Sequence, residues 1–527
     1  MKPGILGLWG LMIFPLYLGA IMLISFISRR RSPTSNDYLN ASRSLPTWAA
    51  ALSFLAYNCG SIEIIGMSAM AAQYGVQALH FYWIGGIPGM IFMGIVVLPV
   101  YMRTGARSLP EYLGMRFGPN VRLLNASLSM VSTAAFSGVA LYAMAQVLHL
   151  IVGWNLPTGA LASALFVLVY VALGGFRATV FTSVFQLFVM IVGIAPLLFL
   201  TVHFTATSFA LRSDRWHLWR TLRPISPSAT LDGIGVALGL GFVISFSYWC
   251  TDFVMIQRAL AARTVDAARR VPLLAGFGKL GIALLVVLPG AAAPALLSGT
   301  RVSTFDETMP ALMSLVFGPA LLSLGTAALL AGLMAGMAGN ISGFSALWTE
   351  EIYRGRLNPE QTERHYIHVG RLSILVCVLL ALLGAYATFC FNDLMEFLQL
   401  ILALFYPPVF VVVLAGITSK RLQSLGAIAG ILGGVLSGLA LQVGFWAGCV
   451  HFGSQMSANF YTALLSFFLT VALCIAGAAF ERKDSSLANR EIGLDENLAR
   501  IIRPSGALIV LSTILLSLCV ILNVIWW

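Results

Sequence analysis

Charged side chains are scarce in this chain. Only 10% of its 527 residues are Asp, Glu, Lys or Arg, whereas 59% are hydrophobic. A soluble globular protein carries about 25% charged residues, which cover its surface with groups that water solvates. The scarcity of charge therefore excludes a soluble globular protein of this length and indicates a protein whose solvent is a lipid bilayer.

The chain also lacks the patterns of metal sites, separate domains and enzymes. Its seven cysteines are scattered, mostly in apolar runs, without zinc-type spacing, so we interpret them as small buried residues. The longest polar stretch, 481–505, is too short to fold alone. Gly343-Phe344-Ser345 lacks the closing glycine of a serine-hydrolase turn. We therefore expect no bound cofactor, no soluble signalling domain and no enzymatic activity.

Long apolar runs dominate the sequence instead. Crossing a hydrocarbon core of about 30 Å requires about 20 apolar residues in a helix. The runs are continuous, which favours helices over a β-barrel of short alternating strands. We predict an all-α polytopic membrane protein with about fourteen transmembrane helices. The predicted spans are 5–28, 46–72, 77–102, 121–152, 157–174, 178–203, 231–258, 271–297, 311–347, 366–390, 394–417, 421–447, 457–480 and 506–526.

The net charge of +11 comes from basic tracts that lie between the spans. This is the positive-inside pattern of a membrane protein, and it argues against a nucleic-acid partner. With the N-terminus outside, the inward loops hold all but seven of the 31 Lys and Arg residues. We therefore predict an integral protein of a plasma or inner membrane with both termini outside. The seven exceptions are Lys2, Arg212, Arg215, Arg220, Arg223, Lys279 and Arg301.

Two spans that lie five apart in the predicted order are interrupted by polar residues. The second span contains Asn58, Gly60, Ser61 and Glu63, and the seventh contains residues 245–252, which read Ser-Phe-Ser-Tyr-Trp-Cys-Thr-Asp. Broken helices at matching positions are typical of transporters with a five-plus-five inverted repeat, in which backbone groups at mid-membrane bind ions and solutes. Helix packing through small polar residues is the alternative explanation for either interruption.

A lysine and a glutamine mark two further spans. Lys279 lies well inside an apolar run, where a charge costs about 2.5–3.5 kcal/mol on insertion scales. We expect it to face a cavity, a partner or a solute, unless it lies near the end of its span and snorkels. Gln399 precedes Pro407-Pro408, which we expect to break or kink the helix.

Several motifs follow one another along residues 35–480. They are Ser108–Leu113 with Arg116–Gly118, Gly174–Val180 with Thr182 and Gln186, Tyr248–Asp252 with Gln257-Arg258, Glu351–Tyr353, Phe397–Gln399, and Pro407-Pro408. No single motif is specific, but the ordered set resembles the sodium:solute symporter family, which includes the sodium/glucose cotransporters. The stretch Tyr248–Asp252 is the one most similar to the sugar cotransporters.

The resemblance implies a fold like that of the bacterial leucine transporter, with ten core helices in two inverted repeats, and sodium-driven uptake. It puts Asn58, Lys279 and Gln399 where the sugar cotransporters hydrogen-bond their sugar. It puts Tyr248, beside Trp249, where they have an inner gate. Amide and amine donors with an aromatic face suit a hydroxyl-rich solute. We therefore expect these residues to bind a small polar solute, with a sugar or polyol favoured.

The chain departs from the family at the sodium site that the resemblance implies. Backbone carbonyls of Ala56, Cys59 and Gly332 remain as ligands, but the two hydroxyl positions are Ala335 and Gly336, which have no side-chain oxygen. A sodium ion needs oxygen atoms to replace its hydration shell. The loss of two of them should weaken sodium binding.

Three other substitutions change the chemistry that the resemblance implies. Ser183 stands where the family has an aspartate, Glu63 where the glucose cotransporters have a sugar-contacting histidine, and Tyr82 where they have a sugar-contacting glutamate. Our hypothesis is that Glu63 couples transport to protons or binds a cationic solute. A neutral, hydrogen-bonded Glu63 with a structural role is the alternative.

These inferences divide the chain into five regions. The first run ends in Arg29–Arg31 and lacks a small-residue cleavage site, so we interpret it as a retained span rather than a signal peptide. The regions are an extra N-terminal helix with a basic loop (1–45), a first five-helix repeat (46–203), an outer loop (204–230), a second repeat (231–420) and accessory helices (421–527).

We predict a secondary active transporter that imports a small polar solute by alternating access and is coupled to sodium, as the resemblance implies. An uncoupled or proton-coupled carrier that uses Glu63 is an alternative. A nutrient sensor that keeps the transporter fold is another, although such a role usually needs an attached signalling domain. The lipid bilayer and the solute are the expected partners, and the oligomeric state is left open.

Overall fold

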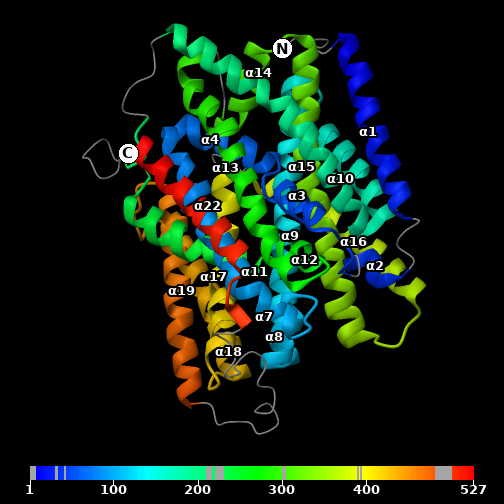
Figure 1. The fold of residues 1–527 in the computed structure, drawn as a ribbon, viewed down its shortest axis with the longest axis vertical. Coiled ribbons are helices and arrows are strands. Elements are labelled where there is room, and N and C mark those ends of the chain that lie inside the picture. The colour runs from blue at the N-terminus through cyan, green and yellow to red at the C-terminus, as the bar shows by residue number, and fades with distance from the viewer. Residues whose placement is uncertain are drawn as a thin grey trace.

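The computed structural model of this protein is a bundle of helices (Figure 1). It describes residues 7–29, 34–40, 43–208, 216–219, 231–298, 304–388, 391, 394–480 and 501–527. Every extended element in these ranges is a helix, and a single β-bridge joins Leu45 and Ala262. The predicted all-α class is confirmed. The outer loop predicted at 204–230, with its four arginines, and the polar stretch 481–505 lie mostly outside the described residues.

The helices follow the apolar runs of the sequence, because only a helix pairs all its backbone groups within one lipid-embedded segment. Elements η2 and η9 are 3₁₀-helices, η3, η4, η8 and η10 are π-helices, and the others are α-helices. Their bounds are α1 (Gly7–Arg29), α2 (Ser35–Asn40), α3 (Thr47–Asn58), α4 (Ser61–Tyr74), η2 (Gly75–Leu79), α5 (His80–Trp83), α6 (Ile87–Phe92), η3 (Met93–Val97), α7 (Leu98–Arg103), α8 (Leu109–Phe117), α9 (Pro119–Val147), η4 (Leu148–Val152), α10 (Leu156–Ser208), η8 (Gly235–Ile244), α11 (Ser245–Thr251), α12 (Phe253–Leu260), α13 (Val265–Leu296), η9 (Phe305–Glu307), α14 (Thr308–Val316), α15 (Pro319–Ala346), η10 (Leu347–Leu357), α16 (Glu363–Thr388), α17 (Leu394–Thr418), α18 (Ser424–Trp446), α19 (Gln455–Phe480) and α22 (Gly506–Ile525).

Eleven helices of the described chain are long and apolar enough to cross a membrane, or up to 12 when the bent pair Gly235–Thr251 and Phe253–Leu260 is counted as one span. This number is smaller than the predicted fourteen. Two of the helices, Ile62–Arg103 with 42 residues and Leu156–Thr201 with 46, are about twice as long as one crossing requires. Each of them extends over parts of two predicted spans.

A glycine with positive φ interrupts each of these two long helices. Gly75 has φ 69° and ψ −148°, and Gly175 has φ 62° and ψ −161°. Residues other than glycine have a strained backbone in this region of the Ramachandran plot. A methyl group at Gly175 would also lie 2.5 Å from Cδ2 of Tyr38. The helical path is therefore broken close to the boundaries that the sequence predicts at 72–77 and 174–178.

Two of the predicted spans differ in their continuity. The run 311–347, predicted as one span, contains the end of α14 and the whole of α15, which are separated by Phe317 and Gly318. By contrast, α17 continues through Pro407 and Pro408 without interruption. The prolines do not break this helix.

The interruption predicted in the second span is present. Helix α3 ends at Asn58 and α4 begins at Ser61, so that Cys59 and Gly60 lie between them. The amide of Cys59 ends the first helix by donating to the carbonyl of Leu55 at 2.7 Å, and the carbonyl of Gly60 starts the second by accepting from the amides of Glu63 and Ile64 at 2.9 and 3.2 Å.

The interruption predicted in the seventh span is present as well. Helices α11 and α12 meet at Asp252 with a bend of 53°. The Asp252 carboxylate accepts a hydrogen bond from the backbone N–H of Met255 at 2.8 Å. It thereby caps the first turn of α12, whose N–H groups would otherwise lack partners.

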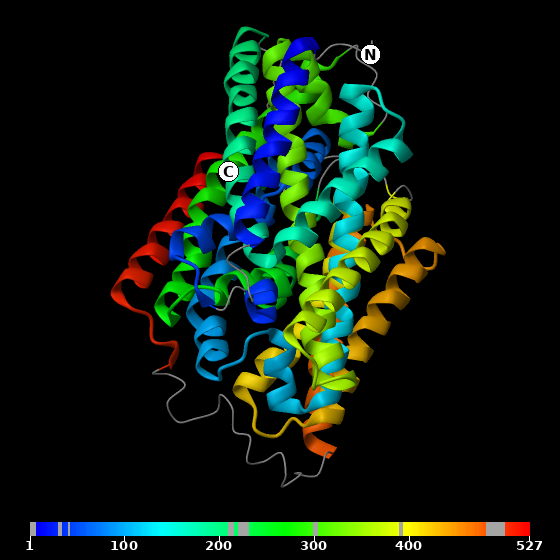
Figure 2. The same ribbon diagram turned by 90° about the vertical axis from the view of Figure 1, so that its right-hand side faces the viewer.

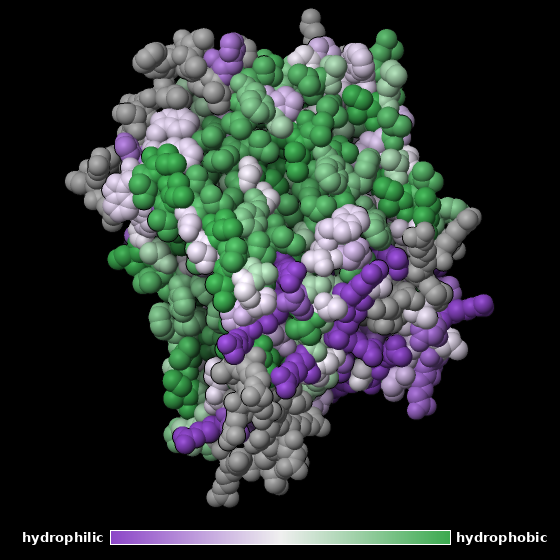
Figure 3. Space-filling model, in the orientation of Figure 1, coloured by the Kyte–Doolittle hydropathy of each residue, from purple (hydrophilic) through white to green (hydrophobic). Residues whose placement is uncertain are grey.

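The broken helices lie inside the bundle. In Figure 1, α3, α11 and α12 are near the middle, with α1 at one side and α19 and α22 at the other, and Figure 2 shows α1 running along the outside. Helices α3, α4, α10 and α13 pack closely on one another or on α15. Apolar side chains cover most of the face seen in Figure 3, and charged side chains gather toward its lower end. This distribution is that of a multi-pass membrane protein.

We expect Gly175→Ala to destabilise the protein, because alanine is strained at this φ and its Cβ would contact Tyr38. The strain of about 1–3 kcal/mol should lower the thermal unfolding midpoint of the purified protein in detergent. Gly281→Ala is the control, since a methyl group at Gly281 meets no atom within 4 Å. Equal midpoints for the two variants would contradict the backbone conformation at Gly175.

Candidate solute-binding site

A cavity of about 110 Å³ lies beside the two breaks. Its lining comes from the end of α3, the start of α4, and from α5, α9, η8, α11, α13, α15 and α17. These elements are far apart in the sequence, so the cavity exists only in the folded chain. Six of the seven residues predicted to bind solute line it, namely Asn58, Glu63, Tyr248, Trp249, Lys279 and Gln399.

Lys279 is the centre of the polar contacts in this cavity. Its ammonium nitrogen Nζ lies 2.6 Å from Oε1 of Glu63 and 2.7 Å from Oδ1 of Asn58. The lysine and glutamate side chains are only 5% and 12% exposed. A charge buried in the membrane is stable when it is paired and hydrogen-bonded. Lys279 therefore has the partner that its position predicts, and it does not snorkel to the surface.

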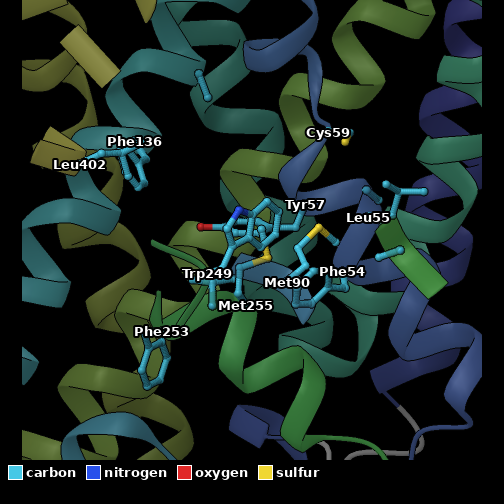
Figure 4. Packing of buried hydrophobic residues seen from close by; sticks show 14 of the residues in the cluster. Phe54, Leu55, Tyr57, Cys59, Met90, Phe136, Trp249, Phe253, Met255 and Leu402 are labelled. Carbon is cyan, nitrogen blue, oxygen red and sulfur yellow. The ribbon is translucent and has the colours of Figure 1, made fainter. Parts of the chain in front are cut away.

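Aromatic rings surround the same ammonium group. Nζ of Lys279 lies 4.7 Å from the ring centroid of Tyr82 and 5.4 Å from that of Trp249, within the range of a cation–π contact. Tyr82 was predicted to bind the solute, but it is fully buried and is not among the residues that line the cavity. Its ring contacts Lys279 without facing the cavity. Trp249 packs on Phe54 with 5.8 Å between the ring centroids (Figure 4). Its indole N–H donates to the carbonyl of Gly85 at 3.1 Å, which fixes the ring.

Asn58 links the ion pair to the second broken helix. While its Oδ1 accepts from Lys279, its Nδ2 donates to the hydroxyl of Tyr248 at 3.3 Å. The ring of Tyr248 packs edge-on against Tyr406, whose hydroxyl donates to Oδ2 of Asp252 at 2.9 Å. A continuous chain of polar and aromatic contacts therefore runs from the first break to the second.

Neutral polar atoms complete the lining. Oε1 of Gln399 and Oγ of Ser245 are buried and have no hydrogen-bond partner among the described residues. Such atoms are rare in native structures unless water or a ligand satisfies them. Asn340 also lines the cavity, and its Oδ1 accepts from the hydroxyl of Tyr57 at 2.7 Å.

Sequence reasoning missed Ser245, Asn340 and Tyr57 as part of this site. Ser245 stands at the start of the interrupted stretch, which was a signal for it. Asn340 follows Gly336 by four residues on α15, and this helix brings both residues to the cavity. The apolar wall, with Phe136 and Leu402 as members, had no sequence signal.

The carbonyl ligands predicted for sodium are partly brought together. A methyl group at Gly60 would lie 2.7 Å from the carbonyl oxygen of Gly332 and 3.6 Å from that of Ala56. Both oxygens therefore face the break, and only glycine leaves room between them. The side chain of Cys59 lies beside the polar groups of the cavity, with its Sγ 3.6 Å from Oδ1 of Asn58 and 4.0 Å from Nζ of Lys279.

Ala335 and Gly336 occupy the two positions where the resemblance implies hydroxyl ligands for sodium. Ala335 is buried, and Gly336 lines the cavity with open space beside its Cα, where a methyl group would be 4.0 Å from the nearest atom, the carbonyl oxygen of Tyr57. Ser183 is fully buried, and its hydroxyl has no partner in the described part of the chain. Two carbonyls and an open position are thus what this neighbourhood offers a cation.

Comparison with known families decides the class of this protein. A model of the sodium:solute symporter family matches residues 38–434. The chain belongs to the sodium:solute symporter family. Its members are secondary transporters, so this symporter is a transporter and not an enzyme. The resemblance inferred from the ordered motifs is confirmed.

Individual relatives agree with the family match. The sodium/glucose cotransporter of Vibrio parahaemolyticus is 28% identical over 468 residues, which cover 82% of this symporter and 84% of the relative. Sodium/glucose cotransporter 2 of Rattus norvegicus is 28% identical over 466 residues, covering 78% and 68%. The structure of an outward-open, substrate-bound Na⁺-coupled sialic acid symporter aligns with a TM-score of 0.75 at 19% identity, covering 90% of this chain and 98% of that one. The last comparison establishes a shared fold.

We expect Gly60→Ala to lower both thermal stability and uptake, because its Cβ would lie 2.7 Å from the Gly332 carbonyl and force α4 away from α15. Overpacking of this kind costs about 1–3 kcal/mol. Gly336→Ala is the matched variant on the other side of the same neighbourhood, where a methyl group has room. Purified variants should differ in unfolding midpoint, with Gly60→Ala lower. The reverse order would contradict the close contact.

Proposed function

We propose that this symporter takes up a small, hydroxyl-rich solute such as a sugar or polyol by alternating access. The observation that supports the proposal is the cavity beside the two breaks, where amide and hydroxyl groups meet an aromatic wall. Gln399 and Ser245 are polar members of its lining, and the ring of Trp249 is fixed by its hydrogen bond to Gly85. Few polar groups in a mostly apolar cavity are the usual means of binding and orienting a small ligand. Two relatives of this symporter are sodium/glucose cotransporters, which supports a sugar as the solute.

Alternating access requires two halves that move against each other, and we assign these to the regions 46–203 and 231–420. Each region contains one broken helix, at Cys59-Gly60 and at Asp252. Division of the two longest helices near Gly75 and Gly175 supports fourteen spans with both termini outside. Rocking of one half around a fixed central site then exposes the cavity to each side in turn.

We propose sodium as the coupling ion, bound weakly by the carbonyls of Ala56, Cys59 and Gly332. One charge that moves inward gains about 2.3 kcal/mol per 100 mV of membrane potential, enough to concentrate a solute appreciably. The missing hydroxyls at Ala335 and Gly336 remove ligands that a strong sodium site needs. Sodium should therefore act at high concentration in the native protein.

Coupling to protons through Glu63 is the second candidate, and the ion pair argues against it. Protonation of Glu63 would leave Lys279 without its partner in the membrane interior. Breaking a buried pair in this way typically costs about 3–5 kcal/mol. The observed contact therefore favours a structural role of Glu63 as the partner of Lys279.

Radiolabelled uptake into proteoliposomes tests the proposal directly. A panel of hexoses, pentoses and hexitols is offered while sodium and proton gradients are imposed separately, and counterflow is measured without any gradient. We expect accumulation of at least one neutral solute driven by inward sodium and no accumulation driven by a proton gradient alone. Counterflow without accumulation would identify an uncoupled carrier, and uptake of no member would refute the assignment of a hydroxyl-rich solute.

We expect Gln399→Leu to reduce uptake of that solute by tenfold or more, equivalent to about 1.4 kcal/mol or more, because it removes an amide that faces the cavity. Gln361→Leu is the control, since Gln361 is exposed and lies outside the cavity lining. Equal losses in the two variants would contradict a role for Gln399 in binding.

Restoring the missing hydroxyls should strengthen sodium coupling. The double variant Ala335→Ser with Gly336→Ser supplies two oxygens where Gly336 has open space. We expect the sodium concentration for half-maximal uptake to fall about tenfold, corresponding to about 1.4 kcal/mol. Gly281→Ser is the control for a serine added to a helix with free space. High sodium affinity in the native protein, or no change in the double variant, would contradict weak sodium binding at this site.

A further inference from the structure

Two opposite charges face the cavity, and each is the partner of the other. Glu63 and Lys279 are the only charged residues among the described residues that line it, and their side chains meet at 2.6 Å. Asp252 and Arg258 lie beyond this lining, the first bound to Tyr406 and the second stacked over Tyr57 at 4.7 Å. They also contribute one negative and one positive charge. The net charge around the cavity is therefore zero.

The ammonium group of Lys279 is fully engaged in this arrangement. Two of its three N–H groups are directed at Glu63 and Asn58, and its remaining side faces the rings of Tyr82 and Trp249. Its side chain also packs closely beside Gly86, where a methyl group would lie only 3.0 Å from Cε. No donor of this lysine is left for an anionic solute.

The carboxylate of Glu63 is also stabilised by its surroundings, in addition to its contact with Lys279. It belongs to the first turn of α4, close to the positive end of the helix dipole, which favours a negative charge. A cationic solute would have to compete with Lys279 for this carboxylate. Opening the pair would leave Lys279 buried and unpaired, which is unfavourable in a medium of low dielectric constant.

We propose that the Glu63–Lys279 pair acts as a charge filter, so that the cavity accepts hydroxyl-rich solutes without net charge and excludes their acidic and amino derivatives. This inference rests on the proposed function and specifies its substrate class. A neutral solute needs neither charge to be released, since it hydrogen-bonds to uncharged groups such as Gln399 and Ser245. An acid or an amine brings a charge for which the paired cavity has no counterpart.

Three variants test the filter because they set the cavity charge independently. Glu63→Gln leaves Lys279 alone and makes the cavity positive, and Lys279→Met leaves Glu63 alone and makes it negative. The double variant Glu63→Gln with Lys279→Met is neutral again but has no ion pair. Each substitution nearly conserves side-chain volume, so that the charge changes more than the shape.

The solutes are also matched in shape. Proteoliposomes of each protein receive the neutral panel sugars together with the corresponding uronic acids and amino sugars, all radiolabelled. We expect the native protein to prefer the neutral sugar at least tenfold over both derivatives. Glu63→Gln should raise uptake of the uronate relative to the sugar about tenfold, and Lys279→Met should do the same for the amino sugar. The neutral double variant should again prefer the sugar.

The outcomes separate the filter from the transport assignment. If the native protein takes up no sugar or polyol, the proposed function fails and the filter with it. If neutral sugars are carried but the ratios stay constant in all three variants, the filter alone is refuted. Thermal unfolding and size-exclusion profiles of each purified variant identify a loss of folding. If a single variant does not fold, the double variant decides, because preference for a charged derivative there would overturn the proposal.

Discussion

The contact between the ammonium group of Lys279 and the carboxylate of Glu63 joins the two regions of the core at the level of the membrane interior. Neither charge is stable alone in a medium without water, so each fixes the position of the other. The pair forms because the break at Cys59-Gly60 starts a new helix, which puts Glu63 in its first turn. Asn58 lies on the other side of the same break. It accepts the second hydrogen bond of the lysine and donates one to the hydroxyl of Tyr248.

The same break also organises the neighbourhood of the proposed cation site. Glycine at position 60 lets the carbonyl of Gly332 approach, and the carbonyl of Ala56 faces the same point. The solute selection and the ion coupling that we propose therefore both depend on one short interruption of one helix. A protein that keeps the break but has Ala335 and Gly336 instead of hydroxyl residues retains the geometry for binding a solute while offering fewer ligands to the ion.

Much of the fold was predictable from the sequence because the bilayer imposes simple rules. Scarce charge and long apolar runs predict a bundle of helices, and polar residues within a run predict a break or a site. Both predicted breaks are present. The number of spans differs from the predicted fourteen because Ile62–Arg103 and Leu156–Thr201 each count as one helix by length and hydropathy, although Gly75 and Gly175 interrupt them near the predicted boundaries. Of the two effects expected of Pro407 and Pro408, a break is absent, since α17 continues through them.

The sequence by itself determined the class of the protein, the two interrupted helices and six of the residues that line the cavity, because the cost of polar groups in lipid is a local property of each segment. Only the tertiary structure decided which groups are partners. The resemblance suggested Lys279 as a donor to the solute, whereas the fold directs its hydrogen bonds to Glu63 and Asn58. It also brings Asn340 and Ser245 to the same cavity. Pairing depends on the distance between side chains on helices far apart in the chain, and that distance is set by the packing of the whole bundle.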